Sequence, residues 1–314
     1  MTYIELMEKF PTEESVIEEY VKIRYPHGVY CSRCGAIKVH QEHKRPKLFH
    51  CRSCHTNFSP FADTMFEKSS TDLRKWMFAI HLFLNGKKGI SGYQLQREIG
   101  VTYKTAWRML KEIRISMGHS GSTEFAEAII EMDECYIGGK PKKGNSHNNN
   151  DSNGNDDNTE NPTPTENKRG RGTKKTPVVG VLNRTDKKVH AKVALPNKEG
   201  KKLTAKQLIE ILKAVAKPKD NNTIITDEFK SYNPLTRNKY IHLIINHKEM
   251  YSDGNGKHTN NIESFWATLK RAVYGIYHHI SVKHMQKYID EFCFRYNNRD
   301  KDMFNLVLKQ SVFA

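Results

Sequence analysis

The sequence contains no long apolar segment. No run of about 18 apolar residues occurs in the chain, so no membrane-spanning helix is predicted. The N-terminus, MTYIELMEKFPTEES, is polar and acidic, and it lacks the apolar stretch of a secretory leader. We therefore expect neither a membrane protein nor a secreted one.

Acidic residues are also in short supply. The chain has 35 Asp and Glu residues against 51 Lys and Arg residues, which gives a formal net charge of +16. An excess of this size favours a polyanionic partner, most simply a nucleic acid. Composition alone leaves open a basic protein that has no such partner.

Cysteine is scarce and unevenly placed. Four of the six cysteines form two C-x2-C pairs with sixteen residues between them: Cys31, Cys34, Cys51 and Cys54. A disulfide framework is typical of small secreted domains, whereas this spacing is typical of a four-thiolate zinc site. Because four protein ligands leave no open position on the metal, one structural Zn²⁺ is expected. The flanking His50 and His55 are expected not to bind it.

The sequence pattern divides the chain into three parts. Residues 1–62 hold a short helical pattern and the predicted zinc ribbon, and residues 63–122 show helical patterns. Residues 123–314 mix strand and helix patterns, which predicts an α/β domain. A tract at about 141–176 is rich in Asn, Asp, Thr and Gly and nearly free of apolar residues, so we expect a low-complexity, disordered insertion there.

Individual elements are predicted from apolar periodicity. A helix is expected after Pro11, and another over residues 71–85 with Thr71 as its N-cap. In the third part, strands are expected at residues 128–137, 177–184, 187–197, 221–229 and 241–247, and helices at 201–217, 257–275 and 284–299. The helix at 284–299 is expected to be the last element.

A helix-turn-helix is predicted between residues 91 and 115. Gly100 lies in a short turn between two amphipathic segments. Trp107, in the second segment, is expected to face the core. The expected contacts to bases and phosphates come from the start of the second helix: Lys104, Thr105 and Arg108. A plain helical hairpin has the same pattern, but the zinc ribbon and the net charge favour DNA binding.

Two predicted buried strands end in the same dipeptide, Asp133-Glu134 and Asp227-Glu228. A carboxylate at the end of a buried strand is costly unless it is paired or bound to metal. Since neighbours in a strand point to opposite faces, one acid of each pair is expected to face a shared site, namely Asp133 and Asp227. The two glutamates are expected to point elsewhere or to support the site from outside. The alternative is that both pairs mark strand ends that enter solvent.

A third carboxylate lies on the helix predicted at 257–275. Glu263 and Lys270 are two turns apart and point almost the same way, along the border of an apolar stripe that includes Trp266. Three converging carboxylates can hold two divalent metal ions for phosphoryl transfer. Lys270 is expected to contact a DNA phosphate or base.

Six short segments, taken in order, resemble a known family. They are YCSRCG…FHCRSCHTNFS, SGYQLQREIGVTYKTAWRMLKEIR, MDECYIGG, TDEFKSY, HTNNIESFWATLKR and EFCFRYNNR. Together they are similar to the DDE-type transposases of bacterial insertion sequences that are related to eukaryotic Merlin elements. The resemblance covers the chain except the tract at about 141–176.

The resemblance implies a zinc ribbon, a helix-turn-helix-like segment and an RNase H-like catalytic domain with a mixed sheet. It implies an enzyme that binds terminal inverted repeats, cleaves the element ends and joins the 3′-hydroxyls to target DNA. Two Mg²⁺ or Mn²⁺ ions and a homo-oligomer on DNA are further expectations. Such a protein would act in the cytoplasm or nucleoid of a bacterium, or in the nucleus of a eukaryote.

The resemblance also assigns site residues. It maps the catalytic acids onto Asp133, Asp227 and Glu263. Some members of the family have Asn at the third position, so Asn260 is an additional or substitute ligand. Phosphates would be positioned by three basic residues: His258, Lys270 and Arg271.

Two rival functions fit the same residues. One is an RNase H-like, sequence-specific nuclease or resolvase without strand transfer. The other is a non-catalytic DNA-binding regulator derived from a transposase, which would be expected to have lost one of the three acids. All three acids are present in this sequence.

Overall fold

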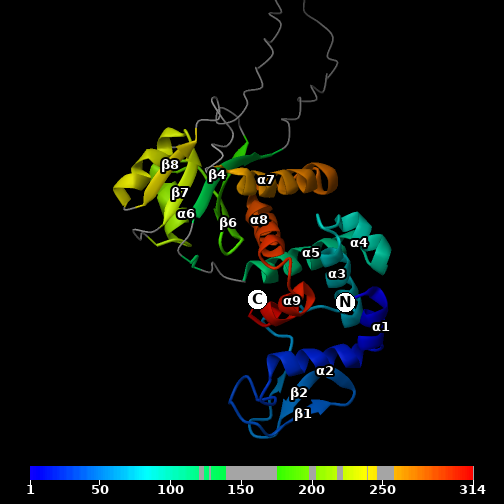
Figure 1. Cartoon of the computed structure of the whole chain (residues 1–314). Coiled ribbons are helices and arrows are strands. Elements are labelled where there is room, and N and C mark those ends of the chain that lie inside the picture. The colour runs from blue at the N-terminus through cyan, green and yellow to red at the C-terminus, as the bar shows by residue number, and fades with distance from the viewer. Residues whose placement is uncertain are drawn as a thin grey trace, which may run out of the picture.

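The computed structural model describes most of the chain outside the predicted insertion (Figure 1). The described residues are 1–119, 124–126, 129–138, 175–197, 203–217, 222–238, 240–245 and 258–313. Of the predicted insertion, only residues 175 and 176 are described, and Thr176 already opens a strand. The expectation of disorder therefore falls on residues outside the described part.

A small three-stranded antiparallel sheet forms one end of the molecule (Figure 1). Its strands, in spatial order, are β1 (Val39–Glu42), β2 (Arg45–Cys51) and β3 (Asn57–Phe58). Its core is little more than Phe49, Phe58 and the buried cysteines. A core this small rarely holds a fold alone, so the cysteine cluster is expected to supply the missing stability.

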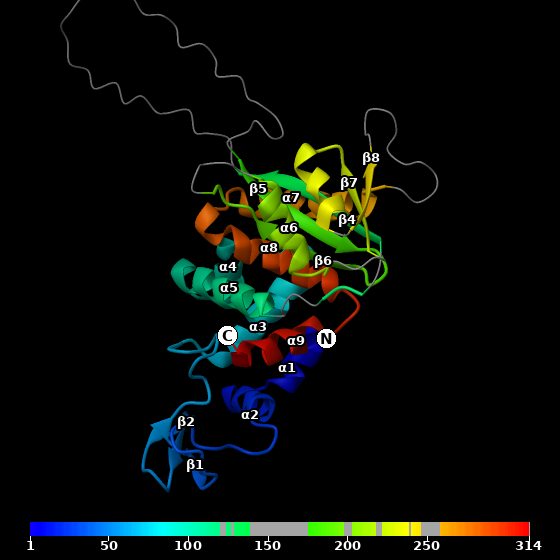
Figure 2. The ribbon, with the colours of Figure 1, turned by 90° about the vertical axis from the view of Figure 1, so that its left-hand side faces the viewer.

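Helices form the middle layer, between this ribbon and the larger sheet (Figure 2). They are α1 (Tyr3–Lys9), α2 (Glu13–Arg24), α3 (Leu73–Asn85), α4 (Gly92–Ile99) and α5 (Tyr103–Gly118). Helix α2 confirms the helix predicted after Pro11, whereas α1 was not predicted. The N-cap of α3 is Asp72 and not Thr71, because the Asp72 carboxylate accepts a 2.7 Å hydrogen bond from the Arg74 amide.

The two predicted helices joined by a turn at Gly100 are present as α4 and α5. Gly100 ends α4 in the left-handed region, with φ of 61°, where glycine avoids a steric penalty. Thr102 then caps α5 by accepting a hydrogen bond from the Thr105 amide. Within the described residues, no helix is long and apolar enough to cross a membrane.

The larger sheet is mixed and has the predicted strands. They are β4 (Ile129–Ile137), β5 (Thr176–Asn183), β6 (Lys188–Val193), β7 (Thr223–Asp227) and β8 (Ile241–Ile245). Their spatial order is β6-β5-β4-β7-β8, with the first three antiparallel and with β7 and β8 parallel to β4. This order confirms the RNase H-like fold.

Side-chain alternation along β4 and β5 creates two cores, one on each face of the sheet. The residues on one face pack against α6 (Ala205–Lys213) and the 3₁₀ segment η2 (Lys230–Asn238). Those on the other face pack against α7 (Asn260–Ala272), its π-helical extension η3 (Val273–Tyr277) and α8 (Val282–Asn297). The strands are apolar on both faces because both are covered.

The chain continues beyond α8, so the prediction that this helix is the last element was wrong. Helix α9 (Met303–Gln310) and the short 3₁₀ turn η4 (Ser311–Phe313) follow it. Phe304, Val307 and Leu308 of α9 are buried in the core of the N-terminal helices and not against the sheet. The two ends of the sequence therefore share one hydrophobic core.

Helix α8 also covers the free edge of β6 with polar side chains. The Asn297 amide group accepts from the Val189 N–H at 2.7 Å and donates to the Val189 carbonyl at 2.9 Å. Gln286 makes the equivalent pair of contacts with the Val193 N–H and the Ala191 carbonyl. Because these groups are satisfied, this edge cannot accept another strand.

A buried ionic cluster joins α8 to the middle helices. Glu291 is fully buried, and it accepts hydrogen bonds from Arg114 at 2.8 Å and from Arg295 at 3.0 Å. Arg295 also donates to three carbonyls at the end of α3, those of Phe83, Leu84 and Gly86. Breaking one partner of a buried pair is costly, so the cluster holds α3, α5 and α8 in one arrangement.

Replacing Glu291 tests this arrangement. Glu291→Ala leaves two buried guanidinium groups without their carboxylate, and we expect it to lower the free energy of unfolding by about 3–5 kcal/mol. Urea unfolding followed by circular dichroism measures the change. The matched control is Glu124→Ala, which removes an exposed ion pair with Lys217 and should change stability by less than about 0.5 kcal/mol. Equal losses in the two variants would contradict the expectation.

Candidate active site and zinc site

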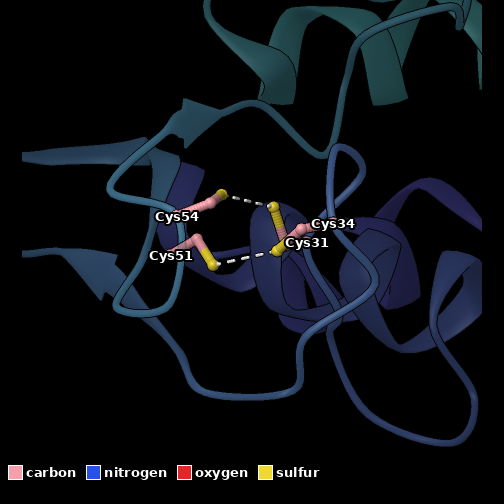
Figure 3. Close-up of side chains that lie close together, drawn as sticks. All are labelled: Cys31, Cys34, Cys51 and Cys54. Atoms are coloured by element: carbon pink, nitrogen blue, oxygen red, sulfur yellow. Dashed lines mark hydrogen bonds between the residues drawn. The ribbon is translucent and has the colours of Figure 1, made fainter.

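The four paired cysteines converge in the ribbon (Figure 3). The Sγ atoms of Cys31 and Cys54 are 3.7 Å apart, and those of Cys34 and Cys51 are 3.6 Å apart. A disulfide needs about 2.05 Å, whereas sulfurs about 2.3 Å from a central zinc in a tetrahedron lie about 3.8 Å from one another. The donor set therefore fits Zn²⁺. Neither His50 nor His55 belongs to the group.

The two cysteine pairs have the same backbone geometry. The Gly35 N–H donates to the Cys31 carbonyl, and the His55 N–H donates to the Cys51 carbonyl, both at 2.9 Å. Gly35 and His55 both have positive φ, 73° and 55°. The residue directly after each pair thus turns the chain back toward the sulfurs, and only the first pair uses glycine for it.

The two predicted aspartates meet where β7 ends beside the middle of β4, so Asp227 ends its strand as predicted and Asp133 does not. Strands β4 and β7 are parallel, with Glu131 beside Ile225, so Asp133 and Asp227 occupy the next equivalent positions. Oxygens of Asp133, Glu134 and Asp227 lie within 4.8 Å of one another. Glu134 is therefore part of the acidic group, although its side chain was expected to point elsewhere or to act from outside. The exposed Glu228 is not part of it.

Glu134 reaches this group from the opposite face of β4. Its carboxylate accepts a 2.9 Å hydrogen bond from the hydroxyl of Tyr232, a fully buried residue on η2. Because β7 ends at Asp227, beside this part of β4, side chains from both faces of β4 can bend toward the group. Strand alternation alone predicted only one acid from each dipeptide.

The carboxyl of Asp133 is electrostatically perturbed. Burial and the negative charges of Glu134, Asp227 and Glu263 together raise its pKa to about 7. Carboxylates crowded in this way repel one another unless a cation lies between them. Hard oxygen donors of this kind suit Mg²⁺ or Mn²⁺, so the residues fit the expected divalent metal ions.

Glu263 lies at the border of this group. It is in the first turn of α7, it is exposed, and its carboxylate accepts a 2.7 Å hydrogen bond from the Thr259 hydroxyl. It is outside the 4.8 Å group, yet its charge acts on Asp133. Asn260, the first residue of α7, is also exposed.

Two of the predicted basic residues, Lys270 and Arg271, lie on the same helix, and His258 lies just before it. Lys270 is exposed and lies beside Cys135, where its charge opposes the burial that raises the pKa of that thiol to about 12. Cys135 and Asp133 are on the same face of β4, so Lys270 is on the site's face of the sheet. Arg271 is exposed and donates to the Thr268 hydroxyl at 3.0 Å. The imidazole of His258 lies 3.1 Å from a guanidinium nitrogen of Arg184.

Glu131 was not recognised from the sequence, yet it fixes where α7 begins. It is fully buried and accepts hydrogen bonds from the Ile262 amide at 2.9 Å, from Asn261 at 2.7 Å and from Arg184 at 2.6 Å. Arg184 also binds the carbonyl of His258. A carboxylate at a helix N-terminus is favourable because of the free amides and the helix dipole. Thr259 supplies no such side-chain cap.

Gly180 is a second residue that the sequence reading missed. It lies opposite Asp133 in the β4–β5 register. A Cβ atom there would be 2.5 Å from the Trp266 ring and 2.9 Å from the Ile262 side chain. Only glycine therefore lets α7 approach this part of the sheet, beside Asp133. A glycine within the run PVVGVLN was the available signal.

The residues predicted to bind DNA on α5 differ in their accessibility. Lys104 is exposed, but Arg108 donates a 2.5 Å hydrogen bond to the Glu67 carbonyl. The Thr105 hydroxyl pairs with that of Thr102 at 3.0 Å. Trp107 was expected to face the core, but 38% of it is exposed. The apolar stripe of α5 passes through Ala106, Met109 and Leu110 instead, which leaves Trp107 on its outer side.

A zinc ribbon followed by helices and an RNase H-like domain with clustered acids defines the class of DDE transposases. The family model for the ISXO2-like transposase domain matches residues 125–297, which is more than half of the chain. The model for the transposase zinc-ribbon domain matches residues 11–57. The chain belongs to the ISXO2-like transposase family.

Two curated relatives carry corresponding descriptions. The uncharacterized protein in transposable element ISH50 of Halobacterium salinarum is 25% identical over 292 residues, and the match covers 91% of each chain. An uncharacterized transposase-like protein of Haemophilus influenzae is 30% identical over 105 residues, which are 33% of this chain and 82% of the relative.

Solved structures give weaker matches. The pre-cleavage Mos1 transpososome aligns with a TM-score of 0.29 and 13% identity, over 74% of this chain and 75% of that one. The Mos1 strand transfer complex gives a TM-score of 0.28 and 14% identity, over 70% of this chain and 73% of that one.

The cysteine geometry predicts one tightly bound zinc ion per chain. We expect Cys51→Ser to lose the metal and to unfold the ribbon, because a structural zinc site couples metal binding to folding. Metal analysis by mass spectrometry and thermal unfolding measure the two effects. The control is Cys293→Ser, outside the ribbon, which should keep one zinc. Full zinc content in Cys51→Ser would contradict the assignment.

The close approach at Gly180 predicts a steric effect on the site. Gly180→Ala places a methyl group against Trp266 and Ile262, and we expect it to lower stability by about 1–3 kcal/mol through overpacking. It should also raise the fluorescence emission wavelength of Trp266 by moving α7 outward. The control is Gly275→Ala, where no atom lies within 4 Å of the new Cβ. Identical unfolding curves for the two variants would contradict this account.

Proposed function

We propose that this protein is an active DDE transposase. It binds the terminal inverted repeats of its element, cleaves the DNA at the element ends and joins the 3′-hydroxyls to target DNA. The observation that carries the proposal is the convergence of Asp133, Glu134 and Asp227 within 4.8 Å, where β7 ends beside the middle of the parallel strand β4. Membership of the family and the zinc ribbon before the site support it.

Asp133, Asp227 and Glu263 would hold two divalent metal ions. When bound, such ions lower the pKa of a water nucleophile and stabilise the attacking and leaving oxygens of an in-line displacement. A pKa of about 7 at Asp133 means that its carboxyl is protonated in a large fraction of molecules until a cation is present. Metal binding at this site is therefore expected to release protons.

The protein's own side chains would place the DNA. Exposed Lys270 and Arg271 lie along α7, where they can contact phosphates on either side of the scissile bond. Glu263 and Asn260 lie in the first turn of the same helix, which Glu131 ties to β4. The proposed ligand Glu263 and the phosphate contacts thus share one helix, which favours a fixed orientation of the scissile phosphate.

The third metal ligand is the least constrained by geometry. Glu263 is outside the closest group, whereas Glu134 is inside it. We propose that Glu263 binds metal directly and that Glu134, which Tyr232 holds from the other face, supports Asp133. Exposure and placement on the site's side of the sheet favour Glu263 for direct contact with metal and substrate.

Substitution of the carboxylates tests the proposal. Asp133→Asn and Asp227→Asn should lower DNA cleavage by far more than about 100-fold, because residues that only support a ligand cost about 10–100-fold. Glu263→Gln should lower cleavage as strongly as the two aspartate variants, whereas Glu134→Gln should lower it by about 10–100-fold. The assay is Mg²⁺- or Mn²⁺-dependent cleavage and joining of labelled DNA that carries the element end, with Mn²⁺ binding measured separately by paramagnetic resonance.

Two controls separate catalysis from binding and from rival functions. Asp227→Asn should bind the same DNA with unchanged affinity in a gel-shift assay. Cleavage without joined products would replace transposition by a nuclease or resolvase activity. DNA binding without any cleavage by the wild-type protein would favour a regulator.

A further inference from the structure

Exposed aromatic side chains gather where α4, α5 and α8 meet. Tyr93 and Tyr103 are 62% and 41% exposed, yet their rings stack with centroids 4.4 Å apart. Trp107, one turn after Tyr103, packs edge-on against the imidazole of His284 at 5.5 Å. Ring-to-ring contacts therefore hold this apolar surface in place although water covers it. Exposed aromatic groups of this kind are typical of interaction surfaces.

Three lysines lie close enough to His284 for their charges to act on it: Lys111, Lys283 and Lys287. Burial and the like charges of Lys111 and Lys283 lower the pKa of Lys287. The same three lysines contribute to the lowered pKa of His284, after burial. Glu112 is the acid that acts against this repulsion, and it already pairs with Lys111 at 3.1 Å. Among the described residues, neither Lys283 nor Lys287 forms an ion pair.

The start of α8 adds further donors at the same place. Ser281 is the N-cap residue of α8, but its side chain makes no capping hydrogen bond. Ser281, Val282 and Lys283 are all exposed. Free amides at a helix N-terminus, next to lysine ammonium groups, favour an anion such as a phosphate.

The surface is also continuous across two parts of the chain. Helix α5 contains the predicted DNA-recognition residues, and α8 belongs to the RNase H-like domain. The Arg114–Glu291 pair fixes one helix against the other in the interior, at 2.8 Å. Figure 1 shows α4 and α5 on the same side of the molecule as α7, the helix of the candidate active site. A ligand that bridges α5 and α8 would therefore meet a rigid surface.

We propose that duplex DNA runs from the start of α5 onto the start of α8. In this proposal Lys111, Lys283 and Lys287 contact backbone phosphates, and Tyr93, Tyr103 and Trp107 pack against the sugar-phosphate backbone. The occupant is chosen by charge complementarity, because a closely spaced group of lysines is neutralised by a ladder of phosphates. The choice of duplex DNA rests on the proposed function.

In this arrangement, few side chains of α5 are left to recognise the base sequence of DNA, because Arg108 and Thr105 form hydrogen bonds within the protein. The lysines on α8 instead supply contacts that do not depend on base sequence. The DNA would be held at once by the recognition helix and by the domain that cuts it, which fixes its path between them.

Salt dependence of binding tests the proposal. Each lost phosphate contact reduces the slope of log affinity against log salt concentration by about 0.9. The double variant Lys283→Ala and Lys287→Ala should therefore lower the slope by about two and weaken binding to end-bearing and unrelated duplexes alike. Fluorescence anisotropy with the zinc-loaded protein, in the absence of Mg²⁺, measures it.

A charge-matched control is available on α6, which covers the other face of the sheet. Lys206→Ala with Lys213→Ala removes two exposed lysines there and should leave the slope unchanged. Equal slopes for the two double variants would overturn the proposal. So would a loss confined to single-stranded DNA. Lys283, Lys206 and Lys213 are exposed and Lys287 is half-buried, so thermal unfolding of both variants is measured to show that each remains folded under the binding conditions.

Tryptophan fluorescence gives a second measurement. Trp76 and Trp266 are buried, so Trp107 is the exposed tryptophan. Duplex binding should quench its emission, and Trp107→Phe should remove the quenching; quenching that persists would overturn its placement against the DNA. If the lysine variants cleave DNA normally and keep the wild-type salt slope, the DNA-binding role of this surface is refuted and the transposase function is not. If the lysine variants change the slope but the wild-type protein does not cleave DNA, the transposase function is refuted and the DNA-binding surface is not.

Discussion

The contact of α7 with the sheet controls the geometry of the candidate active site. The Glu131 carboxylate binds the free amide of Ile262 at the start of this helix, and Gly180 leaves room for Trp266 against β5. Both residues lie next to Asp133, one two positions before it and the other opposite it. Without them the helix would start elsewhere or stand further away, and Glu263 would not act on the acidic group. A buried carboxylate without hydrogen-bond partners is costly, so the contact between Glu131 and the start of α7 is stable.

Electrostatics link this tie to metal binding and to the proposed path of DNA. Burial, together with the charges of Glu134, Asp227 and Glu263, raises the pKa of Asp133 to about 7, so the site favours bound cations. On α5 and α8 the excess charge is positive, because Lys111, Lys283 and Lys287 repel one another. The proposed DNA substrate with divalent cations would relieve both, because its phosphates would neutralise the lysines and its scissile phosphate would share the metal ions.

Much of the fold was predicted because its signals are local. Cysteine spacing gave the ribbon, apolar runs gave each strand of the mixed sheet, and Gly100 gave the turn between α4 and α5. The failures have a common cause. Helix α9 packs on residues from the other end of the chain, and Trp107 is outside because Ala106 and Met109 define the buried stripe. The position of α9 and the exposure of Trp107 depend on which helices pack together, and apolar periodicity does not indicate packing partners.

The sequence by itself determined the kinds of site in this protein: four thiolates for zinc, and aspartates in two buried strands. Residue type and short spacing are enough for that, because ligand chemistry is local. Only the tertiary structure decided which acids meet. Glu134 joins the acidic group from the opposite face, Glu263 lies at its border, and Glu131 binds the start of α7. Parallel pairing of β4 and β7 and the packing of α7 join residues far apart in the chain, and those distances are set by packing rather than by sequence spacing.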